Sequence, residues 1–165
     1  MNIQLVPLAV SETEDLYKNP IVQVFHVYII TPDVVPPAIV LDSTLKRQRA
    51  GEDWFWCAPR LFVHTNQKII VGSGCFKNSP IDGSVEIGCG VAEPYRGRNY
   101  ATEGVRLLVE EGFSKHEVKV ITAETAVWNT ASQRVLEKAS FSRTGERDDP
   151  EDGPVIIWRL ERTAR

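Results

Sequence analysis

The stretch VEIGCGVAEPYRGRNYATEGVRLL, residues 85–108, changes its apolar period halfway along. In its first seven residues the side chains alternate as in a strand. One face carries valine, isoleucine and cysteine, and the other carries only Glu86 beside Gly88 and Gly90. From Ala101 onward, apolar residues recur at helical spacing. The stretch therefore predicts a strand that passes through a short loop into an amphipathic helix, which restricts the chain to folds that mix strands and helices.

Periodicity and turn residues predict the other elements of the chain. Residues 21–37, which contain three prolines, are not assigned. Because the chain has 165 residues and no flexible linker, we expect residues 1–165 to form a single mixed α/β (α+β) domain. We expect strands at residues 2–8, 60–65, 68–76, 84–91, 118–126, 141–146 and 155–160, and helices at residues 11–19, 43–50, 101–113 and 131–139.

Composition argues against several classes of protein. The net charge is −3 at pH 7, so we expect no nucleic-acid partner. The longest apolar run, residues 21–30, is too short to span a bilayer, and the first residues do not resemble a secretion signal. We therefore expect a cytoplasmic protein without a membrane partner. The cysteines and histidines are too scattered for a disulfide framework or a metal site, so we expect reduced thiols and no metal. These residues are Cys57, Cys75, Cys89, His26, His64 and His116.

The glycine-containing face of the strand and the loop after it are candidate ligand contacts. Glycine inside a strand marks close approach by a ligand or another backbone, or else a bulge. If a ligand lies there, Glu86 is the nearest group able to act as a base. The helix start offers unpaired N–H groups that suit phosphate oxygens, with Gly97 allowing close approach and Arg96 and Arg98 adding charge. An ordinary capped helix with solvated arginines is the alternative, and the Walker pattern is absent.

Two segments, GSVEIGCGVAEPYRGRNYATEGVRLL and ITAETAVWNTASQRVLEKASF, resemble the central motifs of the GNAT acyltransferases. Within that family they resemble the ribosomal-protein N-terminal acetyltransferases (RimJ/RimL-like). The resemblance spans residues 68–160 and extends to the order of the elements. It implies the GNAT-like acyl-CoA N-acyltransferase fold, a mixed, mostly antiparallel sheet of six to seven strands flanked by about four helices. It also implies direct transfer of an acetyl group from acetyl-CoA to a primary amine, on a protein N-terminus or a small molecule.

The resemblance also implies where acetyl-CoA binds. The end of the strand would contact the pantetheine through Cys89, Gly90 and Val91. The loop would hold the pyrophosphate through Arg96, Gly97, Arg98, Asn99, Tyr100, Ala101 and Thr102. Asn129 and Ser132 match positions beside the pantetheine and the thioester. From the residues alone, Asn129 is also well placed to cap the helix that follows it, and the two roles are compatible.

Three positions depart from the family pattern. Asn99 stands where the loop usually has glycine or alanine, Pro94 where the wider family often has glutamine or arginine, and Ser140 where glycine is common. Asparagine tolerates a left-handed backbone better than most residues, so the loop can keep its geometry, but the side chain can also crowd the phosphate. Two further interpretations stay open: a degenerate GNAT domain that serves as a binding module, and a nucleotide-binding domain.

For catalysis we predict that Glu86 takes a proton from the amine, directly or through water, and that Ser132 donates to the leaving thiolate. Backbone N–H groups near Val91 would stabilise the oxyanion. A solvated strand glutamate is the alternative for Glu86. For the acceptor amine we predict contacts with Glu86, Trp54 and Trp56, although such aromatics also pack in cores. The acidic turn at residues 148–152 either attracts a cationic amine or is simply solvated. We expect a monomer or a homodimer.

Overall fold

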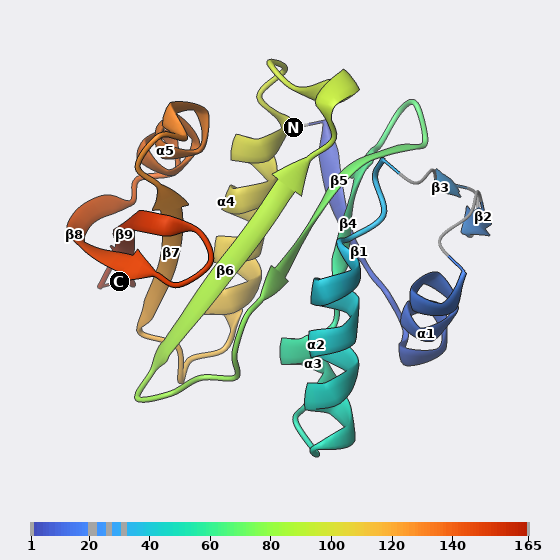
Figure 1. The fold of residues 1–165 in the computed structure, drawn as a ribbon, viewed down its shortest axis with the longest axis horizontal. Helices are drawn as coiled ribbons and strands as arrows, with labels where there is room; N and C mark the ends of the chain where they lie inside the picture. The colour runs from blue at the N-terminus through green and yellow to red at the C-terminus, as the bar shows by residue number, and fades with distance from the viewer. Residues whose placement is uncertain (1, 20–22, 26–27, 31–32, 165) are drawn as a thin grey trace.

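The structure is a computed structural model that describes residues 2–19, 23–25, 28–30 and 33–164. Its elements, in chain order, are labelled in Figure 1. They are β1 (Ile3–Pro7), α1 (Val10–Lys18), β2 (Gln23–Phe25), β3 (Tyr28–Ile30), α2 (Ala38–Arg49), α3 (Trp54–Cys57), β4 (Arg60–His64), β5 (Ile69–Phe76), β6 (Ser84–Val91), a 3₁₀ turn (Glu93–Tyr95), α4 (Tyr100–Ser114), β7 (Val120–Ala126), α5 (Thr130–Lys138), β8 (Ser142–Asp149) and β9 (Gly153–Glu161).

Seven strands follow one another in a single sheet, in the order β1-β4-β5-β6-β7-β9-β8. Every neighbouring pair in this order is antiparallel except β6 and β7, which are parallel. The short strands β2 and β3 pair with each other, and β3 joins β5 through a parallel pairing of Ile29 with Ile69. The predicted mixed, mostly antiparallel sheet is therefore confirmed.

Helices cover both faces of the sheet. One apolar core includes Phe62 and α4 residue Leu108. A second core includes Leu61 and Val63, the neighbours of Phe62 on β4, together with α2 residue Leu41. Because successive residues of a strand point to opposite faces, the two cores lie on opposite sides of the sheet. In Figure 1, α4 lies behind the sheet and α2 in front of it.

Glycines allow α4 to lie close against the sheet. A Cβ added at Gly104 of α4 would lie 2.3 Å from the Phe62 ring, and one added at Gly74 of β5 would lie 2.6 Å from the Leu108 side chain. Phe62 and Leu108 are both fully buried, so neither can move aside into solvent. The chain therefore needs glycine at these two positions to seat α4 directly behind β5 and β6.

Strands β6 and β7 pair over only three residues each. Residues 84–86 of β6 pair with residues 120–122 of β7. Beyond Glu86, β6 stays paired with β5 as far as Val91, whereas β7 stays paired with β9 as far as Ala126. The two halves of the sheet therefore diverge after Glu86, and this divergence positions the site described below.

Most predicted elements are found near their predicted bounds, and β6 spans the predicted residues 84–91. The prediction for α2 was wrong at its start: the helix begins at Ala38, not at residue 43, because Pro37 is its N-cap. Leu41 and Leu45 are buried by that longer helix. The pattern does not predict α3, so the described residues contain five α-helices instead of about four. The helix predicted at residues 11–19 is α1, which ends at Lys18, and Pro20 lies outside the described residues.

Candidate active site

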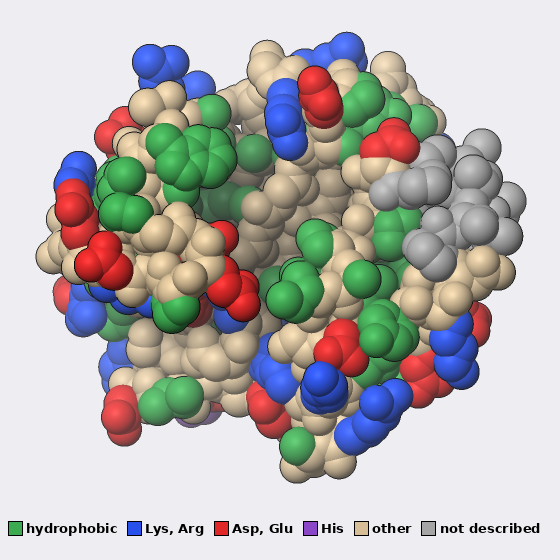
Figure 2. Space-filling model, in the orientation of Figure 1, with side chains coloured by type: hydrophobic (Ala, Val, Ile, Leu, Met, Phe, Trp, Pro, Cys, Tyr) green, Lys and Arg blue, Asp and Glu red, His purple; other side chains and the backbone are tan. Residues whose placement is uncertain are grey.

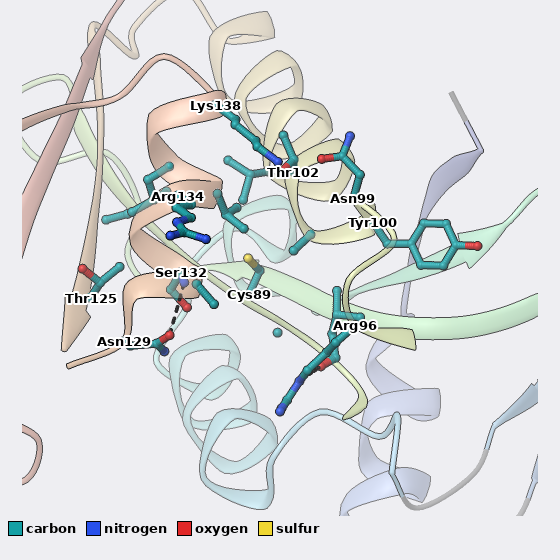
Figure 3. Close-up of a pocket in the computed structure, with 18 of the residues that line it drawn as sticks. Cys89, Arg96, Asn99, Tyr100, Thr102, Thr125, Asn129, Ser132, Arg134 and Lys138 are labelled. Atoms are coloured by element: carbon teal, nitrogen blue, oxygen red, sulfur yellow. Dashed lines mark hydrogen bonds between the residues drawn. The ribbon is translucent and has the colours of Figure 1, made fainter. Parts of the chain in front are cut away.

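A groove of about 1270 Å³ lies where β6 and β7 diverge. Its walls come from β6, the loop and first turns of α4, the end of β7, and α5 (Figure 3). It is larger than the roughly 300–1,000 Å³ of most small-molecule pockets, so an elongated ligand fits it. Every residue predicted to contact the cofactor lines it: Cys89, Gly90, Val91, Arg96, Gly97, Arg98, Asn99, Tyr100, Ala101, Thr102, Asn129 and Ser132.

The floor of the groove is the second half of β6. A Cβ added at Gly90 would meet nothing within 4 Å, and one added at Gly88 would meet only the Lys77 side chain, at 3.6 Å. The pairing with β5 is regular along this stretch, so neither glycine marks a bulge. Figure 2 shows the hollow in the middle of this face, with a floor that is mostly backbone and uncharged polar atoms. The glycine-containing face therefore leaves open space beside the strand.

The Cys89 thiol points into the groove between α4 and α5 (Figure 3). Cys89 is exposed in the groove, and a thiol with its ordinary pKa of about 8.5 is already mostly protonated at neutral pH. A protonated thiol is a poor nucleophile. Cys89 is thus a neutral part of the groove wall, and all three cysteines, Cys57, Cys75 and Cys89, are free.

The loop before α4 presents the start of the helix to the groove. Gly97 has φ 76°, and Asn99, the N-cap of α4, has φ 67° and ψ 9°, so both lie in the left-handed region. Asn99 therefore adopts the left-handed backbone that asparagine tolerates better than most residues. The Asn99 carbonyl accepts from the Glu103 N–H, so the N–H groups of the turn before Glu103 point toward the groove end without an intrahelical partner. Arg96 Nε donates to the Val91 carbonyl, at 3.0 Å, and ties the loop to β6.

Helix α5 forms the opposite wall. The Asn129 Oδ1 accepts from the Ser132 N–H at 3.2 Å, so the predicted N-cap is confirmed. Three cations that our sequence reasoning missed also line the groove: Arg106 of α4, and Arg134 and Lys138 of α5. The spacing of Arg134 and Lys138 places them on one face of the helix, which is a signal that the sequence does contain. With Arg96 and Arg98, they make the α4–α5 side of the groove basic.

Glu86 lies where the two strands separate, but it does not line the groove. Its Oε1 is 3.0 Å from Lys77 Nζ. Glu124 of β7 does line the groove, and the Arg147 guanidinium holds the pKa of its carboxyl below the usual range, with Nη2 at 2.7 Å from Oε1. Sequence reasoning missed Glu124, because its partner Arg147 is 23 residues away on another strand.

The tryptophans predicted to contact the substrate do not line the groove. Trp56 is only 5% exposed and packs edge-on against Phe55 and Phe76, so it belongs to the apolar core. Trp54 donates from Nε1 to the Leu8 carbonyl at 2.9 Å and borders a separate cavity of about 380 Å³. The prediction that Trp54 and Trp56 contact the acceptor amine in this groove is therefore wrong. The tryptophan that does line the groove is Trp128, which is 75% exposed.

In the acidic turn between β8 and β9, backbone N–H groups and Arg147 compensate the negative charge of Asp149. Asp149 Oδ1 accepts from the backbone N–H groups of Glu151 and Asp152, and Asp149 Oδ2 pairs with Arg147 at 2.9 Å. These backbone bonds, followed by the Arg147 contact, lower the pKa of Asp149. The turn is therefore an ordered structure linked through Arg147 to Glu124.

No group of three or more His, Cys, Asp or Glu in the described part of the chain is placed to hold a metal ion. His26 lies outside the described residues. Among the described helices, none combines the length and apolar character that crossing a bilayer requires.

Comparison with known proteins places this geometry in a family. The sequence profile of the acetyltransferase (GNAT) domain matches residues 3–142. No curated protein matches the chain. Similar solved structures include a GNAT-family acetyltransferase from Bacillus anthracis, with TM-score 0.65, 16% identity, and coverage of 98% of this chain and 95% of that chain. Aminoglycoside acetyltransferase AAC(6')-Ib in complex with coenzyme A has TM-score 0.66, 20% identity, and coverage of 97% and 95%.

RimL, a ribosomal-protein α-N acetyltransferase in complex with coenzyme A, has TM-score 0.67, 16% identity, and coverage of 98% of this chain and 94% of that chain. At such identities the three structures show a shared fold. The family itself is shown by the domain profile, which covers most of the sequence. The chain belongs to the GNAT acetyltransferase family.

Proposed function

We propose that this protein is an N-acetyltransferase that moves an acetyl group from acetyl-CoA directly to a primary amine. The observation that supports this most is the groove, which begins where β6 and β7 diverge and ends at the N-terminus of α4. Structures with the same fold include enzymes solved with coenzyme A whose names specify aminoglycosides and ribosomal proteins as substrates. The acceptor of this chain is an amine on a protein N-terminus or a small molecule.

The residues around the groove fit acetyl-CoA. The N–H groups at the start of α4, with Arg96 and Arg98, suit a pyrophosphate, because a helix N-terminus attracts anions. The open side of β6 at Gly90 leaves room for a pantetheine arm, which would run past Cys89 and Val91. When bound, acetyl-CoA supplies a thioester as the acetyl donor. Arg134 and Lys138 add positive charge along the same wall.

The proposed chemistry uses Ser132, which lines the groove, and Glu86, which lies beside the groove where β6 and β7 separate. An amine is protonated near neutral pH and must lose a proton before attack. Glu86 would take that proton, directly or through water. Backbone N–H groups near Val91 would stabilise the developing oxyanion, and the Ser132 hydroxyl would donate to the leaving thiolate. Ser132 is held in place by the capped first turn of α5.

Binding and turnover test this function separately. Thermal shift should show stabilisation by acetyl-CoA and not by ATP or NAD, because binding to the folded state raises the unfolding temperature. Release of free thiol, measured with a panel of amines and N-terminal peptides, should then reveal turnover. Stabilisation by acetyl-CoA without turnover over a broad panel would favour the alternative, a degenerate domain that binds CoA as an interaction module. Stabilisation by ATP or NAD alone would favour a nucleotide-binding domain.

A further inference from the structure

We infer that Lys77 is a self-acetylation site, with its own Nζ as an internal amine acceptor at the end of the groove. This inference rests on the proposed acetyl transfer. Lys77 follows β5 directly, and its backbone N–H donates to the Glu86 carbonyl at 2.7 Å. The side chain therefore begins beside the residue that we propose as the base.

The Lys77 side chain lies across the open face of β6. A Cβ at Gly88 would lie 3.6 Å from Lys77 Cδ and 3.9 Å from Cε, so the lysine stem passes over this glycine, which lines the groove. The stem ends with Nζ at 3.0 Å from Glu86 Oε1. A Cβ at position 88 would be in ordinary van der Waals contact with the stem, so only a side chain longer than that of alanine would displace it. Because Gly88 has no side chain, the Lys77 stem extends over it toward the point where β6 and β7 separate.

The Lys77 ammonium pairs with the Glu86 carboxylate and also feels the negative charge of Glu124. Desolvation lowers the pKa of Lys77, but the hydrogen bond and charge of Glu86, together with the charge of Glu124, outweigh it and raise the pKa. Glu124 lines the groove, and Glu86, which does not line it, lies where β6 and β7 separate. An external amine would need the same surroundings: a carboxylate to hold its ammonium and then accept its proton. Lys77 therefore occupies the position that the chemistry assigns to an acceptor amine.

The transfer requires only the Lys77 amine, the Glu86 carboxylate and the thioester of acetyl-CoA. The Lys77 ammonium gives one proton to Glu86, and the neutral Nζ attacks the thioester carbon. A new N–C bond forms, the C–S bond breaks, and the nitrogen gives its second proton to the thiolate, which leaves as the free thiol of CoA. The product is an uncharged amide, so the ion pair with Glu86 is lost. Acetylation of Lys77 would therefore release Glu86 for an external acceptor.

Mass mapping of the full chain after incubation with acetyl-CoA tests the inference. Lys46 is the matched control, because it is also paired with a carboxylate, Asp42, at 2.8 Å, but both residues belong to α2 and not to the strands that border the groove. Lys77 should gain an acetyl group at least about tenfold faster than Lys46, because a positioned amine reacts as an intramolecular partner. The first-order rate constant should not change with protein concentration. In Lys77→Arg, which keeps the charge, the acetylated peptide should disappear.

The outcomes separate this inference from the proposed function. Equal acetylation of Lys77 and Lys46, or the same Lys77 rate in protein unfolded by urea, would show ordinary chemical acetylation and overturn the inference. Turnover of external amines with Lys77 unmodified would overturn the inference alone and leave the proposed function standing. If neither Lys77 nor any external amine is acetylated although acetyl-CoA binds, the proposed transfer itself fails.

Discussion

Glu124 on β7 and Arg147 on β8 are joined by two hydrogen bonds that cross the intervening strand β9, with Nη2 at 2.7 Å from Oε1. Because this contact lowers the pKa of Glu124 below its ordinary 4.5, ionised Glu124 stabilises the fold above the ordinary pKa. That stabilisation is lost as the pH falls through the lower, folded-state pKa. Glu124→Gln should therefore lower the free energy of unfolding at neutral pH and make little difference at strongly acidic pH.

The expected loss at neutral pH is about 1 kcal/mol or less, since Arg147 is 43% exposed and water screens the pair. Urea unfolding at a series of pH values measures it. Glu161→Gln is the control, because Glu161 pairs with Arg159 at the surface and is 71% exposed. A Glu124→Gln deficit that stays constant down to the lowest pH would contradict the linkage.

Gly104→Ala should destabilise the protein even though alanine is the better helix former. Alanine in a helix interior gains about 1 kcal/mol over glycine. Here the new Cβ would lie 2.3 Å from the buried Phe62 ring, and overpacking of this kind costs about 1–3 kcal/mol. We expect a net loss of up to about 2 kcal/mol in urea unfolding.

The control for Gly104 is Gly145→Ala, whose Cβ would meet nothing within 4 Å, so its effect should stay within about 0.5 kcal/mol. Combining Gly104→Ala with Phe62→Leu should cost less than the sum of the single changes, because the smaller side chain makes room for the Cβ. Strict additivity would show that the clash with Phe62 is not the cause.

The junction from β6 to α4 could be predicted from the sequence because both periods are local: alternate residues set the strand, and Ala101 begins a helical spacing. The divergence of β6 and β7 could not, because it depends on β7 continuing along β9, a pairing between distant segments. The role of the tryptophans was misjudged for a related reason. Large aromatics suit both a cleft wall and a core, and only the packing of Trp56 against Phe76 separates the two.

Ser140→Gly should stabilise the protein. Ser140 follows α5 with φ 71°, and the Phe141 N–H donates to the Leu136 carbonyl at 3.0 Å, which closes the helix as a Schellman motif. Glycine adopts this left-handed conformation without the strain that serine bears, so we expect a gain of about 0.5–1 kcal/mol in urea unfolding. Ser142→Gly, in strand β8, should instead lose stability. A gain from both changes would point to an effect on the unfolded chain.

Asn99→Gly should leave the affinity for acetyl-CoA within about twofold of the original, because the backbone already has the φ of 67° that glycine would supply. Asn99→Val should weaken binding by about tenfold, since a β-branched residue is strained by about 1–2 kcal/mol in this conformation. Calorimetric titration with acetyl-CoA measures both. If Asn99→Gly binds much more tightly, the asparagine side chain itself obstructs the phosphate site.

Glu86→Gln should lower turnover by about a hundredfold or more, because the amine would lose its general base, whereas the Kd for acetyl-CoA should hardly change. Ser132→Ala should cost less, about tenfold, since a thiolate leaves more readily than an alkoxide and depends less on a donor. Steady-state kinetics over a range of pH, beside titration with acetyl-CoA, separates kcat from binding. Glu110→Gln, an exposed change on α4 that lies outside the groove, controls for the loss of one negative charge. Full turnover by Glu86→Gln at every pH would remove Glu86 as the base and make Glu124, the carboxylate that lines the groove, the next residue to substitute.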